Sequence, residues 1–497
     1  MTKKATALSF SWIALLLGAP LAAEPDDVQF SRPVLGMGQE VTHVVDGADY
    51  VEKEGGIKNR GWILPTTGTV DFQARRDERL NLEVMIGVTY FAAPYQYAQP
   101  QNYVRNISLT VPRLTASYAF GDVADPLLKV DVGIFNYKYN ENARNLGEYM
   151  FRSWAYPGII FTGGTYGYVN NNSATLTGIR MKQSLGAFSH ELLLNVETEM
   201  TPIYDLNLTY MARFNYRNIF TVGGGVQLAR FVNADIDPNM SVHYFKHNGT
   251  TYVSDPEGVS YYSSLQQGIQ EKMEEPGLSA ADSARLQREY DRVTEALRVN
   301  DSIAFGQIHP DIKSYSAKAI KPDLYFSFDP KPLLGIDAFG PRDMVIYGEA
   351  AILGVQDRPV YYEDIWQRIP MMMGFNIPTF KVLDVLTVEA EYYGNRWLPT
   401  YRVQTGSGGG GASGSNAVPT PLMDANAGNY YPTDWDKDNW KWSIYAEKTL
   451  VRGVSFSVQA ASDHSRTWDW VTYGKTPWEM YTTPSEWYWS SKLSVRI

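Results

Sequence analysis

Apolar and polar residues alternate one by one along most of the chain. The run from Leu80 to Tyr90 shows one apolar face and one largely polar face: Leu82, Val84, Ile86 and Val88 against Asn81, Glu83, Met85 and Thr89. A period of two residues is that of a β-strand. A similar run covers residues 70–75, and only residues 76–79 separate the two. The two runs therefore predict a tight β-hairpin.

The same unit recurs along the chain, for example across residues 206–228 and 442–460, with longer polar connections between hairpins. This alternation of short and long connections predicts an all-β fold, a transmembrane up-and-down antiparallel barrel with its short turns at the periplasmic rim. We expect about 16 strands, within roughly 14–18, which is enough to enclose an aqueous lumen. The predicted strands are residues 30–44, 67–76, 80–93, 103–120, 127–139, 173–184, 189–200, 205–216, 219–233, 314–329, 343–356, 370–378, 382–398, 438–449, 453–466 and 485–497.

Two of these strands are irregular. Pro33 and several glycines interrupt the first, and a periplasmic or plug-like segment over residues 24–66 would show the same pattern. In the fourth, the apolar positions change phase across Pro112, from Ile107, Leu109 and Val111 to Leu114, Ala116 and Tyr118. A β-bulge at this point would explain both the change of phase and the proline.

Two stretches do not alternate. Residues 279–300 predict a helix, with Ser279 and Asp282 as a capping pair and an apolar stripe formed by Leu286, Tyr290, Val293 and Leu297. This helix lies in a long connection, residues 234–313, that we expect to be an extracellular loop. The loop could be a subdomain, a lid over the pore or a solvated decoration. Residues 405–419 are rich in Gly and Ser, which predicts a flexible loop.

The first 23 residues predict a secretory signal peptide. Lys3 and Lys4 precede an apolar stretch over residues 5–18, and Ala22 and Ala23 supply small residues for cleavage. This stretch is shorter than the ~20 residues of a membrane-spanning helix. Removal of the signal peptide, residues 1–23, takes away two lysines and no acid, so the net charge changes from −10 to −12. An acidic exported chain argues against nucleic acid as a partner.

Composition narrows the choice of function further. The chain has no cysteine, which excludes thiol catalysis and thiolate metal sites. Only 44% of residues are hydrophobic, and no segment after the signal peptide approaches a helical span, so a membrane role requires a barrel. No phosphate-binding loop or nucleophile elbow is present, and we expect no enzyme activity and no organic cofactor. The segment DWDKDN could gather calcium ligands from Asp434, Asp436 and Asp438.

The final segment alternates up to the last residue: Trp487, Trp489, Leu493, Val495 and Ile497 against Glu486, Tyr488, Lys492, Ser494 and Arg496. Here the chain resembles porin-like outer-membrane β-barrel proteins of Gram-negative bacteria, whose terminal strand carries such a pattern. Most of those proteins end in phenylalanine, whereas this chain ends in isoleucine. The resemblance implies a place in the outer-membrane lipid bilayer, recognition by the insertion machinery and, as is usual among similar porins, a homotrimer.

In a barrel that faces lipid with its apolar side chains, the opposite set lines the lumen. On that assignment the pore-lining candidates are Arg75, Glu83, Arg113, Asp131, Arg180, Glu197, Arg213, Glu349, Glu389 and Glu391. Neighbouring strands would present opposite charges, which could form cross-strand ion pairs that keep the wall rigid. Any charges left over would set a preference among ions or solutes.

The connection over residues 140–172 is the third external loop of this barrel. Barrels similar to general diffusion porins fold that loop inwards, which by position alone makes Glu141, Arg144, Glu148 and Arg152 candidates for a constriction. A loop lying outside the barrel fits the sequence equally well.

The function predicted from the sequence is a porin that lets small hydrophilic solutes or ions diffuse passively. Three alternatives remain: a surface adhesion or structural protein anchored by the barrel, a carbohydrate-binding uptake channel, and a secreted soluble all-β protein that binds carbohydrate. Aromatic residues near the strand ends, such as Trp440 and Trp489, fit a girdle at the membrane interface or a stacking track for sugars.

Overall fold

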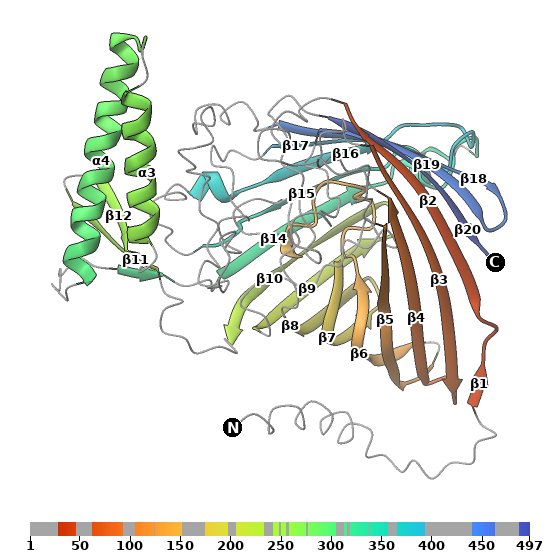
Figure 1. The fold of residues 1–497 in the computed structure, drawn as a ribbon. Coiled ribbons are helices and arrows are strands. Elements are labelled where there is room, and N and C mark those ends of the chain that lie inside the picture. The colour runs from red at the N-terminus through yellow and green to blue at the C-terminus, as the bar shows by residue number, and fades with distance from the viewer. Residues whose placement is uncertain are drawn as a thin grey trace.

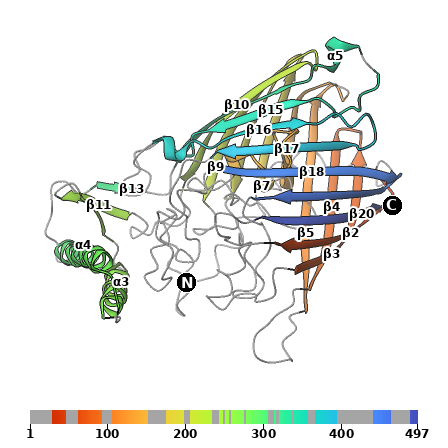
Figure 2. The ribbon, with the colours of Figure 1, turned by 90° about the horizontal axis from the view of Figure 1, so that it is seen from above.

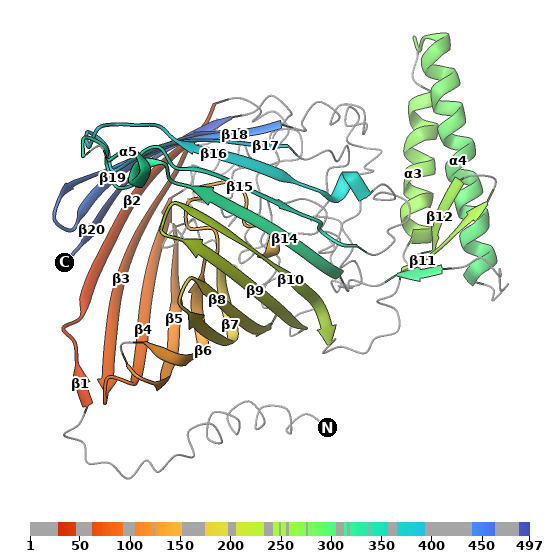
Figure 3. The ribbon, with the colours of Figure 1, turned by 180° about the vertical axis from the view of Figure 1, so that it is seen from behind.

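Sixteen antiparallel strands form a closed barrel in the computed structural model (Figures 1 and 3). The structure describes residues 28–45, 62–92, 105–123, 125–151, 174–196, 205–232, 242–247, 250–254, 258–274, 277–304, 313–315, 319–335, 337–355, 365–392, 440–462 and 487–497. Strands adjacent in the chain are neighbours in the wall. The wall strands are β2 (Val34–Val44), β3 (Trp62–Arg76), β4 (Leu80–Ala92), β5 (Arg105–Gly121), β6 (Pro126–Tyr137), β7 (Ala174–Leu185), β8 (Phe188–Val196), β9 (Leu206–Tyr216), β10 (Phe220–Val232), β14 (Ala319–Phe328), β15 (Ile346–Ala351), β16 (Met371–Asn376), β17 (Val385–Tyr392), β18 (Trp440–Val451), β19 (Val454–Ala461) and β20 (Tyr488–Arg496).

The barrel closes between its first and last wall strands. Leu35 donates its N–H to the Ile497 carbonyl oxygen at 2.8 Å, and Ile497 donates back to Leu35 at 2.9 Å. Each of the sixteen predicted strands coincides with a wall strand, so the predicted fold class is confirmed. The first segment is a wall strand and the plug alternative for residues 34–44 is wrong. A short strand, β1 (Val28–Phe30), extends it by pairing with the end of β3.

The predicted bulge in β5 is confirmed. Met85 pairs with Arg113 and Gly87 pairs with Thr110, so Ile86 alone faces both Val111 and Pro112. The extra residue lets apolar side chains on either side of it point the same way. Leu109 before the bulge is 73% exposed on the outer surface, and Leu114 after it is 50% exposed.

Apolar side chains face outwards and polar side chains face inwards around the barrel. On β14, Leu324 is 61% exposed, while its inward neighbours Lys321 and Asp323 are 1% and 7% exposed. On β17, Val388 is 37% exposed and Glu389 is fully buried. This is the reverse of a water-soluble protein and matches a wall that contacts lipid. The predicted orientation of the two faces is therefore confirmed for these strands.

The connections divide between two rims. Short turns such as residues 77–79 and 217–219 share one rim, which we call the short-turn rim, and the long connections share the other, the long-loop rim. At the short-turn rim, residues 329–345 include the short helix α5 (Lys331–Leu334). At the long-loop rim, residues 365–368 form the 3-10 helix η4 (Ile365–Arg368). No helix among the described residues is long and apolar enough to cross a membrane.

A small α/β unit separates β10 from β14 in the chain (Figure 2). It consists of β11 (Val242–His247), β12 (Thr250–Ser254), α3 (Gly258–Met273), α4 (Ala280–Ala304) and β13 (Lys313–Tyr315). The predicted helix is α4, and Ser279 caps it by accepting the Asp282 N–H at 3.1 Å. The sequence analysis missed α3. Ile269 of α3 packs with Leu286 and Val293 of α4, so the unit has its own small core.

Candidate functional site: the lumen and its inserted loop

The chain beyond β6 turns into the barrel. Residues 138–151 lie against the inner face of the strands on the far side, and they end in a 3-10 turn, η2 (Tyr149–Phe151), whose three residues are at most 3% exposed. We call residues 138–151 the inserted loop. Of the two arrangements left open for the third external loop, the structure has the inward one over these residues.

Glu389 of β17 is the first anchor of the inserted loop. Its carboxylate accepts three consecutive backbone N–H groups, from Arg144 at 2.6 Å, Asn145 at 2.9 Å and Leu146 at 3.0 Å. Tyr347 of β15 donates its hydroxyl to the same carboxylate at 2.7 Å. Hydrogen bonds to an ionised acceptor are about twice as strong as neutral ones. A single buried carboxylate therefore fixes the backbone at the middle of the loop.

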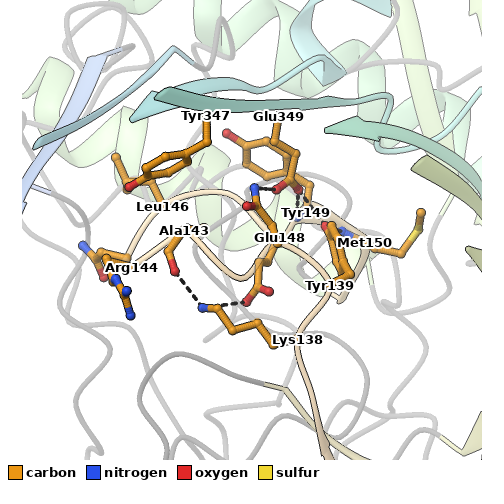
Figure 4. Close-up of polar contacts among 12 residues, drawn as sticks. Lys138, Tyr139, Ala143, Arg144, Leu146, Glu148, Tyr149, Met150, Tyr347 and Glu349 are labelled. Atoms are coloured by element: carbon orange, nitrogen blue, oxygen red, sulfur yellow. Dashed lines mark hydrogen bonds and ion pairs between the residues drawn. The ribbon is translucent and has the colours of Figure 1, made fainter. Parts of the chain in front are cut away.

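Glu349 of β15 is the second anchor (Figure 4). It accepts hydrogen bonds from the Tyr139 hydroxyl at 2.6 Å, the Asn140 side-chain amide at 2.8 Å and the Tyr149 N–H at 2.9 Å. The Tyr149 hydroxyl in turn donates to Glu391 of β17 at 2.9 Å. Both ends of the inserted loop are thus tied to one wall.

Aromatic packing supports the base of the loop. The ring centroids of Tyr137 and Phe151 are 5.2 Å apart, and those of Tyr139 and Tyr325 are 5.4 Å apart. Lys321 of β14 donates to the Met150 carbonyl at 2.7 Å. These groups belong to a buried cluster on the inner wall, an apolar patch inside an otherwise polar lumen.

Glycine makes room for the rings that hold the loop. A Cβ on Gly374 of β16 would overlap the ring of Tyr347, its neighbour across the strands. Gly223 of β10 stands in the same relation to Tyr325. Within the loop, Gly147 has a φ of +80°, a conformation that glycine adopts without strain. The chain turns there to approach Glu349.

Ion pairs run along the opposite wall. Arg113 of β5 lies 3.0 Å from Glu83 and 3.7 Å from Asp71, and Arg496 of β20 lies 3.4 Å from the same Asp71. These four residues form a chain of two positive and two negative charges. Asp71 is buried beneath the two guanidinium groups, with its side chain 3% exposed.

A second set of linked ion pairs, also electrically neutral, joins β6, β7 and β8. Arg180 lies 2.7 Å from Glu191 and 3.9 Å from Asp131, and Lys129 lies 3.5 Å from Asp131. The guanidinium of Arg180 also stacks over Tyr137, 5.2 Å from the ring centroid, and the Tyr137 hydroxyl donates to Glu191. Inward charges therefore pair across neighbouring strands in both sets of linked ion pairs.

The structure separates the predicted pore-lining residues into two groups. Glu83, Arg113, Asp131 and Arg180 belong to the chains just described, and Arg75 is exposed on the inward face of β3. Glu349, Glu389 and Glu391 point inwards but are 4%, 0% and 5% exposed, because the inserted loop covers them. They hold the loop and do not face open lumen, which corrects the placement expected for these three residues. That the first group lines a conducting pore stays a prediction.

Three of the constriction candidates lie in the inserted loop. Glu141 pairs with Arg213 of β9 at 2.9 Å, and Glu148 lies 3.8 Å from Lys138 (Figure 4). Arg144 reaches over the ring of Tyr445 at 5.9 Å. Several predicted residues and segments lie outside the described residues: Arg152, Glu197, Asp434, Asp436, Asp438, residues 1–23 and residues 405–419.

Sequence reasoning missed Tyr139, Asn140, Lys321 and Tyr347. For Lys321 and Tyr347 a signal existed, because both share the inward parity of their strands. Nothing in the sequence marks backbone N–H groups as the partners of Glu389. Across the described residues, no group of three or more His, Asp or Glu side chains could hold a metal ion. The proposed calcium ligands lie outside those residues.

No protein-family model matches this sequence, and a search of well-characterised proteins finds none similar in sequence. Solved structures of similar fold include OprB of Pseudomonas putida, with a TM-score of 0.46 and 8% identity over 99% of this chain and 97% of that one. An OmpF of Salmonella typhi gives 0.42 and 9% over 96% and 99%. An anion-selective porin from Comamonas acidovorans gives 0.41 and 10% over 94% and 99%. The closed antiparallel barrel of this chain follows from its own strand pairing and not from these similarities.

Proposed function

We propose that this protein is an outer-membrane channel through which small hydrophilic solutes and ions diffuse passively, without covalent chemistry. The observation that carries the proposal is the exposure of charged side chains inside the barrel. Lys129 is 48% exposed and Arg213 is 36% exposed, although both face inwards. Solvent therefore reaches the inner wall, while the outer wall presents leucine, valine and phenylalanine to lipid.

The inserted loop sets the width of such a channel. A barrel of sixteen strands leaves an aqueous interior, and residues 138–151 occupy part of it along β14 to β17. Because Glu389 binds the middle of the loop through three backbone N–H groups, the path there depends little on which side chains point towards the solute. We propose that this loop is the constriction and that it limits the size of solutes that pass.

Self-association is part of the proposal. Gln39 of β2, Thr66 of β3 and Ser491 of β20 face outwards on three adjacent strands, and Thr66 donates to Gln39 at 2.5 Å. Polar groups within the outer band are costly against hydrocarbon. We propose that this seam contacts a second copy of the chain, as in a homotrimer. Chemical crosslinking of purified membranes should then give oligomers, and a bulky Ser491→Trp substitution should reduce their yield.

Conductance of the refolded protein in a planar bilayer tests the channel. We expect discrete steps whose size scales with bulk salt concentration, as for a water-filled pore. A folded barrel without conductance would favour the alternative of an anchored surface protein, with the unit of α3 and α4 as its functional part. Uptake of radiolabelled sugars into proteoliposomes, measured beside amino acids of similar size, separates general diffusion from a carbohydrate-specific channel.

A further inference from the structure

Two lysines face each other inside the barrel near the short-turn rim. Lys129 of β6 and Lys182 of β7 are register partners on the inward face. They lie two residues nearer the short-turn rim than the partners Asp131 and Arg180. Both lysine side chains are exposed. Like charges placed directly opposite on neighbouring strands destabilise a sheet. A compensating carboxylate would be expected beside them.

The nearest carboxylates compensate this pair only in part, through one contact of Asp131 with Lys129. Glu191 of β8 is the register partner of Lys182, yet its oxygens bind Arg180 and the Tyr137 hydroxyl. Asp131 accepts the Ser117 hydroxyl at 2.6 Å and reaches Lys129 at 3.5 Å, with its own side chain only 8% exposed. Lys182 makes no ion pair with any described residue. The ammonium group of Lys182 is therefore left to the solvent of the lumen.

A third inward cation adds to this imbalance. Arg75 of β3 is exposed and makes no ion pair with any described residue, whereas Arg213 of β9 is paired with the exposed Glu141 of the inserted loop at 2.9 Å. On the far wall, the loop covers Glu349, Glu389 and Glu391. The exposed inward charge of the described strands is thus mainly positive, although the whole chain carries −10.

We propose that Lys129 and Lys182 form an anion-binding site in the channel and that the channel prefers small oxyanions, such as phosphate and carboxylates, over cations. The inference rests on the proposed function, because it names the solute class of that channel. Two ammonium groups on adjacent strands can share one oxyanion through several N–H donors. Binding at exposed lysines is weak enough for the anion to leave again, as conduction requires.

The reversal potential of the refolded channel under a gradient of potassium chloride measures the preference. We expect the chloride permeability to exceed that of potassium. The double variant Lys129→Gln/Lys182→Gln should lower this ratio by about twofold to fivefold, since each removed charge acts at short range through screened solvent. Replacing both lysines by glutamate, Lys129→Glu/Lys182→Glu, changes the net charge by four instead of two and should lower it further. Added inorganic phosphate should block the chloride current of the wild type more strongly than that of the double variant.

Lys381→Gln is the matched control, because it removes the same charge from a turn at the same rim and outside the wall strands. Its permeability ratio should equal that of the wild type. A cation-selective wild type, or an unchanged ratio in the double variant, would overturn the proposal. If the folded protein shows no conductance, the channel proposal fails instead. Broadening of the inorganic phosphate signal in 31P NMR with micellar protein still tests the site, and equal broadening by wild type and double variant would reject it.

Discussion

The carboxylate of Glu389 on β17 accepts the backbone N–H of Asn145 at 2.9 Å, across 244 positions of the chain. The bond joins a loop that leaves the wall after β6 to a strand on the other side of the lumen. Two more consecutive N–H groups donate to the same carboxylate. The carboxylate therefore takes the place of the backbone carbonyl groups that a neighbouring strand would have supplied as acceptors. The middle of the loop can therefore remain inside the barrel without secondary structure of its own.

Replacing this acceptor should release the middle of the loop. In Glu389→Gln the side-chain amide offers one oxygen and no charge to three donors. An unsatisfied buried donor costs about 1–3 kcal/mol, so we expect local opening to become easier by about 2 kcal/mol. Amide hydrogen exchange at residues 144–146 should then accelerate by about 30-fold. Single-channel current should become larger or noisier as the constriction loosens.

Glu83→Gln provides the control for this variant. Glu83 also lies on the wall, on β4, and accepts hydrogen bonds from Asn81 at 2.8 Å and Arg113 at 3.0 Å, on the wall opposite the inserted loop. Exchange at residues 144–146 should remain as in the wild type. Equal protection in Glu389→Gln and wild type would mean that packing at Tyr149 and Phe151, and not the carboxylate, holds the loop.

Gly374→Ala should disturb the Glu389 anchor through its neighbour Tyr347. The new methyl group would overlap the ring of Tyr347, which donates to Glu389 at 2.7 Å. We expect the ring to move and the hydrogen bond to be lost, at a cost of about 1–3 kcal/mol from overpacking. Chemical denaturation in detergent micelles measures this loss. Gly68→Ala is the comparison, because a Cβ at Gly68 has no atom within 4 Å; a similar loss there would exclude the ring as the cause.

The wall could be predicted from the sequence because its physics is local. Alternation with a period of two fixes both the strands and the side that faces lipid, and the short turns fix which strands are neighbours. Even the irregularity at Pro112 leaves a trace, as a change of apolar phase. The helix α3 was missed because its segment, which begins GVSYYSSLQQ, lacks a capping pair such as Ser279 and Asp282.

The site could be predicted only in part. Parity identified Glu349, Glu389 and Glu391 as inward, but their partners lie in a loop some 200 or more positions away, and the loop partners of Glu389 are backbone N–H groups. Backbone N–H groups are the same at every residue, so no sequence pattern marks them. The ion pairs between neighbouring strands, such as Asp131 and Arg180, were accessible because register follows from the hairpins.

Acid should weaken one contact at the short-turn rim. The pKa of Asp384 lies below its ordinary value because hydrogen bonds from Thr449 favour the ionised form, against a small opposing effect of burial; Lys448 adds to the lowering. A carboxyl whose pKa is lowered on folding stabilises above its unfolded pKa, and the gain disappears as the pH falls through the folded value. Asp384→Asn should therefore reduce stability at pH 7, by less than about 1 kcal/mol for so exposed a group. Urea titrations at pH 7 and pH 2.5 should show a larger difference at the higher pH; a loss of equal size at both would point to side-chain shape and not charge.

Deleting Pro112 should leave the barrel intact. The deletion lets Ile86 pair with Val111 while Met85 keeps Arg113 and Gly87 keeps Thr110. Leu109 and Leu114 would both still face outwards, and Arg113 would still reach Glu83. We expect the variant to fold and to show the heat-dependent gel migration of the wild type.

Deleting Ser117 from the same strand gives the contrasting case. No bulge absorbs the loss, so a slip of one residue must turn either Leu114 or Tyr118 towards the lumen and a polar neighbour towards lipid. The yield of folded barrel should fall sharply compared with the Pro112 deletion. If the Pro112 deletion failed to fold and the Ser117 deletion succeeded, the extra residue at the bulge would not be what keeps both apolar runs of β5 on the outer face.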